Sequence, residues 1–122
     1  MTMTTVYKTA FVAALLAIYL LAVLPGDSLP GVQLWDKLQH AAAFFLLALL
    51  MGRAWPRSSL WRFRLPCLFA YGVIIELSQS MLSYREASLN DLLANASGLL
   101  LYVVLVNAVG EFTARRSNRG RA

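Results

Sequence analysis

The chain has 122 residues, enough for one domain of ordinary size and too few for two. Apolar residues make up 59% of it and charged residues only 14%, whereas a soluble domain has about 45–50% apolar and about 25% charged residues. This composition excludes a disordered chain and argues against a soluble globular protein, so we expect an integral membrane protein despite the formal net charge of +5.

Four apolar segments follow one another along the chain and predict an all-α membrane bundle of four helices, forming a single domain over residues 1–122. The predicted spans are about residues 9–24, 38–54, 65–82 and 92–112, followed by a basic tail over residues 113–122. An apolar helix needs about 20 residues to cross the hydrocarbon of a bilayer. None of the segments shows the period-2 alternation that a membrane barrel requires.

The first predicted span has a second interpretation as a secretory signal peptide. Lys8 would then form the basic region and residues 9–24 the apolar region. No small-x-small cleavage site follows; Pro25 and Gly26 stand there instead, and this pair stops a helix. We therefore expect an uncleaved first span.

The basic residues are concentrated in three places. The N-terminal tail carries Lys8, and four arginines lie between spans two and three and four more in the C-terminal tail: Arg53, Arg57, Arg62, Arg64, Arg115, Arg116, Arg119 and Arg121. Because cationic loops stay in the cytoplasm, both termini and the middle loop should be inside and the other two loops outside. These residues need no nucleic-acid partner, since anionic lipid headgroups attract them equally well.

Polar residues gather in the outer half of this predicted bundle. Asp36 and His40 are four apart at the start of the second span and therefore share a helix face, with Lys37 beside them. Glu76 and Gln79 lie within the third span, where a charge near the bilayer centre costs at least ~2.5 kcal/mol. Helix capping by Asp36 and interhelical hydrogen bonding by Glu76 are the structural alternatives to a functional site.

The fourth span begins with a similar group. Ser88-x-x-Asp91 resembles a capping box, but Asn95 lies one turn deeper and capping does not explain it. Three helices and a loop should thus supply one outward-opening site. Its expected ligand-binding residues are Asp36, Lys37, His40, Glu76, Gln79, Arg85, Ser88, Asp91 and Asn95.

These residues form three ordered motifs that resemble the VanZ-like family of small bacterial membrane proteins. The motifs are Asp36-Lys37-x-x-His40, then Tyr71-Gly72-x-x-Ile75-Glu76-x-x-Gln79, then Arg85-x-x-Ser88-x-x-Asp91-x-x-Ala94-Asn95-x-x-Gly98. The resemblance covers about residues 35–105. It implies a multi-pass helical protein of the bacterial cytoplasmic membrane. Some members are associated with resistance to the glycopeptide teicoplanin, but the resemblance names no reaction.

Three functional classes remain open. In the first, the site binds a cell-envelope or lipid-linked ligand, with Arg85 and Lys37 contacting an anionic group. In the second, a membrane-embedded hydrolase or transferase uses His40 and Glu76 as an acid–base pair near neutral pH, with Asp91 as a third catalytic candidate. A metal bound by His40, Glu76 and Asp91 is a weaker variant, because no metal-binding signature is present. In the third, the protein has a structural or assembly role. The sequence identifies no cofactor.

Overall fold

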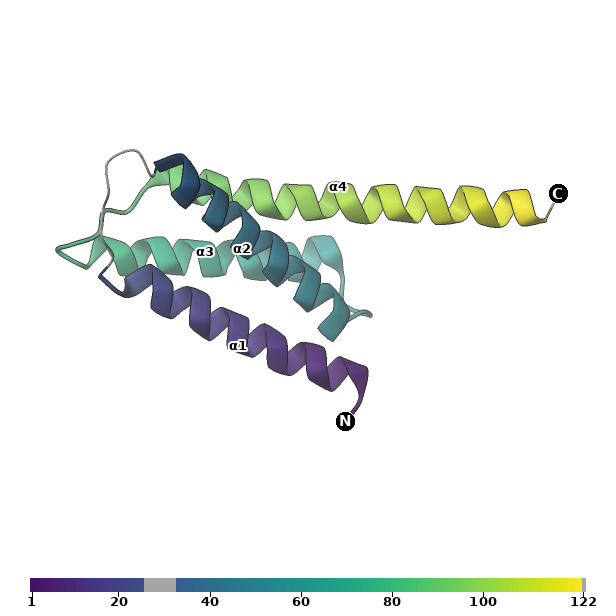
Figure 1. The fold of residues 1–122 in the computed structure, drawn as a ribbon, viewed down its shortest axis with the longest axis horizontal. Coiled ribbons are helices and arrows are strands. Elements are labelled where there is room, and N and C mark those ends of the chain that lie inside the picture. Colours follow the sequence, from purple (N-terminus) through teal and green to yellow (C-terminus); the bar gives the residue numbers. More distant parts are fainter. Residues whose placement is uncertain (26–32, 122) are drawn as a thin grey trace.

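The computed structural model describes residues 1–25 and 33–121, and helices are the only regular structure within them. The elements are α1 (Met3–Val23), α2 (Gln33–Ala54), a π-helical turn η1 (Leu60–Arg64), α3 (Leu65–Ser80) and α4 (Leu89–Gly120). The four α-helices alternate in direction, so both termini lie at one end of the bundle and α2 and α4 begin at the other (Figure 1). For the described residues, the prediction of an all-α fold with four helices is confirmed.

Local sequence signals set the ends of α1. The Thr2 hydroxyl accepts a hydrogen bond from the Thr5 amide at 3.3 Å, which satisfies one of the free amides at the helix start. At the other end Leu24 is extended, with φ −69° and ψ 145°. Because Pro25 follows it, the helical conformation is disfavoured at Leu24 and the helix stops.

The wide turn η1 was not predicted from the sequence, and Pro66 accounts for it. Proline has no amide hydrogen, and its ring clashes with the carbonyl four residues earlier in a regular helix. Here the Leu65 amide donates to the Leu60 carbonyl five residues back, so the turn is wider than an α-helical one. The five residues of η1 continue directly into the sixteen of α3, giving 21 helical residues, or roughly 31 Å.

Three helix boundaries differ clearly from the prediction. Helix α1 begins at Met3 rather than near residue 9, so the N-terminal tail is part of the helix. Helix α2 begins at Gln33 rather than near residue 38, which places Asp36 inside its first turn instead of at its cap. Helix α4 continues to Gly120 through the predicted basic tail, because alanine and arginine in this stretch are strong helix formers. It therefore extends well past the other helices (Figure 1). Residues 26–32, which contain most of the predicted first outer loop, lie outside the described residues.

Helix α2 occupies the centre of the packing. It lies against both α1 and α4, and α3 contacts the same two helices from the other side. Helix α2 supplies more buried hydrophobic residues to the core than any other element, namely Phe44, Leu47, Ala48, Met51 and Ala54. Gly98 of α4 lies directly against the Ala41 carbonyl of α2, so the absence of a side chain allows the two backbones to approach closely.

Helices α1 and α4 are each long and apolar enough to cross a membrane. Many of their large apolar side chains are exposed, among them Leu16, Leu21, Leu100 and Leu101. Soluble monomers rarely expose apolar surfaces of this extent. Their length and composition therefore point to membrane association.

Candidate functional site

His40 lies where α2 meets α4, and one side of its ring is held by a buried amide. The His40 Nδ1 atom is 3.0 Å from the Asn95 side-chain oxygen, and Asn95 is only 1% exposed. An amide oxygen only accepts hydrogen bonds, so Nδ1 carries the proton. Gly72 of α3 makes room for Asn95, because a Cβ there would come within 3.2 Å of the Asn95 amide nitrogen.

The other side of the His40 ring faces two carboxylates. Its Nε2 atom is 3.9 Å from Asp36 Oδ2, one turn earlier on α2, and 4.0 Å from Asp91 Oδ2 in the first turn of α4. The His40 and Asp91 side chains are 16% and 15% exposed, and Asp36 is 48% exposed. The cluster is therefore reachable from the end of the bundle. Lys37, the residue after Asp36 on α2, is partly buried.

Glu76 has a different environment from the one expected of an acid–base partner of His40. One of its carboxylate oxygens accepts a hydrogen bond from the main-chain amide of Ser88 at 2.9 Å, and Glu76 is 8% exposed. We expected a side-chain partner, and the structure gives a main-chain one from the loop before α4. Buried Glu76 thus joins α3 to the start of α4.

The predicted capping box at the start of α4 is only half formed by its own residues. The Ser88 hydroxyl accepts a hydrogen bond from the Asp91 main-chain amide at 3.4 Å, as the motif requires. The returning bond to the Ser88 amide comes from Glu76 of α3 instead of from Asp91. Asp91 therefore keeps its carboxylate free to face His40.

Gln79 and Arg85 bind the end of α1. The Gln79 side-chain amide donates to the Ala22 carbonyl at 2.9 Å, and Arg85 Nη2 donates to the carbonyls of Leu24 at 3.0 Å and Leu21 at 3.4 Å. These are the carbonyls that a helix leaves free at its last turn, and a guanidinium near them is favourable. Gln79 and Arg85 thus stabilise the bundle as well as forming part of its surface.

A cavity of about 510 Å³ opens between α1, α2 and α3 at this end of the molecule. Its polar wall comprises Asp36, Gln39, His40, Gln79 and Arg85. Its apolar wall comprises Ile18, Leu21, Ala22, Ala42, Ala43, Phe44 and Ile75. Four of the nine residues expected in one site therefore line the cavity. Glu76, Ser88, Asp91 and Asn95 pack on the α4 side, and His40 and Asp36 belong to both groups.

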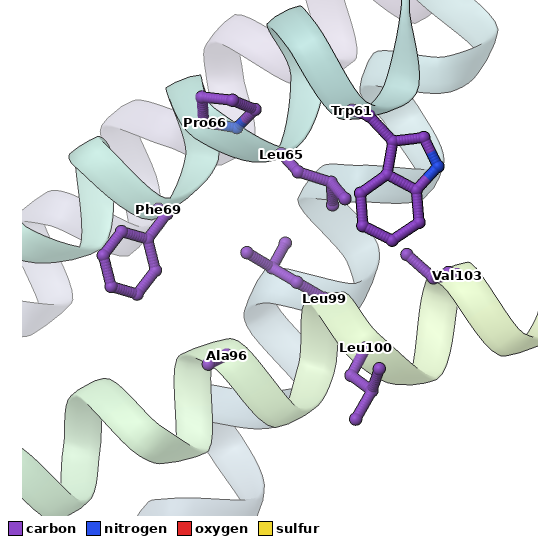
Figure 2. A pocket seen from close by; sticks show the side chains of 8 residues that line it. All are labelled: Trp61, Leu65, Pro66, Phe69, Ala96, Leu99, Leu100 and Val103. Carbon is purple, nitrogen blue, oxygen red and sulfur yellow. The ribbon is translucent and has the colours of Figure 1, made fainter.

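A second hollow of about 380 Å³ lies between η1, α3 and α4 and is lined almost entirely by apolar groups. Figure 2 shows Trp61, Leu65, Pro66 and Phe69 on one side of it and Ala96, Leu99, Leu100 and Val103 on the other. Among the described residues that line it, the Trp61 indole N–H is the only polar side-chain group, and none of these residues is ionisable.

No pattern in the sequence predicted that α1 would contribute to the cavity. Ile18 and Leu21 are ordinary residues of an apolar span, and the carbonyls that bind Gln79 and Arg85 belong to the main chain. Only the pairing of α1 with α2 and α3 makes these groups part of a site.

A family model described as VanZ/LLP1 matches residues 2–110, which is most of the chain. Comparison with curated proteins and with solved structures gave no match.

Proposed function

The chain therefore belongs to the VanZ/LLP1 family, and on this premise we propose that it is a multi-pass protein of the bacterial cytoplasmic membrane. We further propose that its cavity binds the anionic headgroup of a lipid-linked or other cell-envelope ligand. Any link to glycopeptide tolerance would follow from binding such a ligand.

Helix lengths and charge support the membrane part of this proposal. Helices α1 and α4 are apolar enough to span, α2 has 22 residues, and η1 with α3 is of similar length. Both termini lie at one end of the bundle (Figure 1), as an even number of spans requires. Arginine-rich segments at that end favour the cytoplasm.

The cavity is the observation that supports ligand binding. It has one charged and polar wall and one apolar wall, a combination that suits an amphiphile with a polar headgroup. Arg85 uses only its Nη2 atom in the hydrogen bonds to α1. Within the described residues, its Nε and Nη1 atoms make no hydrogen bond, so they can donate to a phosphate or carboxylate of the ligand.

Binding of a polyprenyl phosphate to the protein in lipid nanodiscs tests the proposal, with the unphosphorylated polyprenol as comparison. We expect the phosphate to bind at least about tenfold more tightly, the equivalent of one charge-assisted hydrogen bond. Arg85→Gln should abolish this preference. Arg57→Gln is the matched control, because it removes the same charge from an exposed site at the other end.

Arg85→Gln also removes hydrogen bonds to α1, so a second variant is needed. Gln39 is exposed, lines the cavity and makes no hydrogen bond within the described residues, so Gln39→Glu should repel the phosphate without disturbing the fold. Equal binding of phosphate and alcohol, or equal effects of Arg85→Gln and Arg57→Gln, would contradict the proposal. A purely structural role predicts that binding is lost only where the folded protein is lost.

The acid–base alternative has less support from the geometry. One oxygen of Glu76 is occupied by the Ser88 amide, and His40 is paired with Asn95 and faces Asp36 and Asp91. Within the described residues, no hydrogen bond or ion pair joins Glu76 to His40.

A further inference from the structure

We propose that His40, Asp36 and Asp91 bind a divalent transition-metal ion, with zinc as the first choice, between the starts of α2 and α4. This ligand set differs from the one considered from the sequence, because Asp36 takes the place of Glu76. The proposal is independent of a ligand in the cavity.

The candidate ligand atoms lie close to one another. One nitrogen or oxygen atom from each of the three residues lies within 4.8 Å of the others, and the two His40–Asp distances are 3.9 and 4.0 Å. A tetrahedral zinc ion with metal–ligand bonds of about 2.0–2.2 Å holds its ligand atoms about 3.3–3.6 Å apart. Each histidine–aspartate pair therefore has to close by about 0.5 Å when the ion binds, and the two aspartates have to approach each other as well.

The protonation of His40 strengthens the inference. Because Nδ1 donates to Asn95, a neutral ring presents an unprotonated Nε2 to the carboxylates. Three acceptors then face one another, and within the described residues neither carboxylate accepts a hydrogen bond; the His40–aspartate distances are themselves too long for one. A cation among them would remove this repulsion. A metal-binding histidine usually donates its other ring N–H to a carboxylate, a backbone carbonyl or a water molecule. The Asn95 side-chain oxygen takes that place here, which makes Asn95 a positioning residue.

The donor set indicates the kind of ion. One imidazole and two carboxylates suit Zn²⁺, Mn²⁺ or Fe²⁺. Three protein ligands at a partly exposed site leave a coordination position for water or for an oxygen of a ligand.

Positively charged side chains near the two aspartates compete with a metal ion. Lys37 and Arg85 both act electrostatically on the Asp91 carboxylate. A doubly protonated His40 would also satisfy the two aspartates without any metal. The Lys37→Gln variant removes one of these competing charges. It should therefore tighten metal binding severalfold.

The test uses the full chain in detergent, stripped with a chelator and titrated with Zn²⁺ alone, and with Co²⁺ for its visible absorption. We expect one ion per chain. His40→Ala and Asp91→Asn should weaken binding about 100-fold or more, and partly exposed Asp36→Asn, which should not affect folding, about tenfold. Glu86→Gln, which removes an exposed carboxylate of the neighbouring loop, is the matched control and should have no effect.

Two results would overturn the proposal. If parent, Asp36→Asn and Asp91→Asn bind zinc equally, any bound ion is adventitious and His40 is simply ion-paired. If Glu76→Gln weakens binding as much as Asp91→Asn, the ligand set is the one containing Glu76. Thermal unfolding of each apo variant shows whether a loss of binding reflects a loss of folded protein.

Discussion

The Ser88 amide is hydrogen-bonded by Glu76 instead of by Asp91, and this arrangement determines how the polar residues at this end pair. In an ordinary capping box the acid of the same helix binds the amide of the capping residue. Here Glu76 binds the Ser88 amide from α3, and Asp91 is left to face His40. One buried glutamate thus joins two helices and at the same time releases a carboxylate for the histidine cluster.

Replacing Glu76 should therefore affect stability in a graded way. Glu76→Leu leaves the Ser88 amide without its partner and should lower the free energy of unfolding by about 1–3 kcal/mol. Glu76→Gln keeps an oxygen acceptor in the same place and should cost clearly less. Thermal unfolding in detergent, together with hydrogen exchange at the Ser88 amide, measures both effects. Equal losses for the two variants would mean that this hydrogen bond contributes little.

The sequence predicted one shared site at this end, and it could not predict how the polar residues would pair. Spacing along one helix places Asp36 and His40 on a common face, and topology brings α2 and α4 together. The bond between Glu76 and the Ser88 amide depends on how the loop before α4 folds over α3. No pattern of residue types determines that loop path.

At the level of the helices, the contact between α2 and α4 depends on Gly98. A Cβ at this position would overlap the Ala41 carbonyl, which belongs to the backbone and cannot rotate away. The approach allows Asn95, one turn earlier on the same face of α4, to reach His40. Helix spacing and site geometry are thus set by the same glycine.

Gly98→Ala should separate α2 from α4 and lower the free energy of unfolding by about 1–3 kcal/mol. Gly110→Ala in the same helix is the control, because no atom lies within 4 Å of its added Cβ. It should be neutral or stabilise the helix by about 0.5–1 kcal/mol. Circular dichroism during heating measures both variants. A Gly98→Ala protein as stable as the parent would show that the helices can adjust.

The existence and order of the helices could be predicted, whereas their exact extents could not. Apolar runs identify α1 to α4 because the segments between them are charged or contain proline. The turn η1 was missed because its cause, a clash at Pro66, involves the carbonyl of a residue before the apolar run. The length of α4 was missed because its charged end was taken for a tail, although arginine is a good helix former.

For the whole molecule, the proposed orientation predicts where each end of the bundle lies. A reporter fused after Arg121 should be active in the cytoplasm, and one inserted at Ala87 should be active only outside it, because arginine-rich segments resist translocation. Activity measured in intact cells tests both sites. An exported reporter after Arg121 would reverse the topology and place the cavity on the cytoplasmic side.

Helices α4 and α2 have uncharged stretches of different length. On α4, Asp91 and the next charged residue, Glu111, are 20 positions apart, or roughly 30 Å. On α2, Lys37 and the next charged residue, Arg53, are only 16 positions apart, or roughly 24 Å. A bilayer of uniform thickness cannot match both sides of a bundle that crosses it. The surrounding lipid is therefore expected to be thinner beside α2 than beside α4, so that the protein itself would shape the membrane next to its polar end.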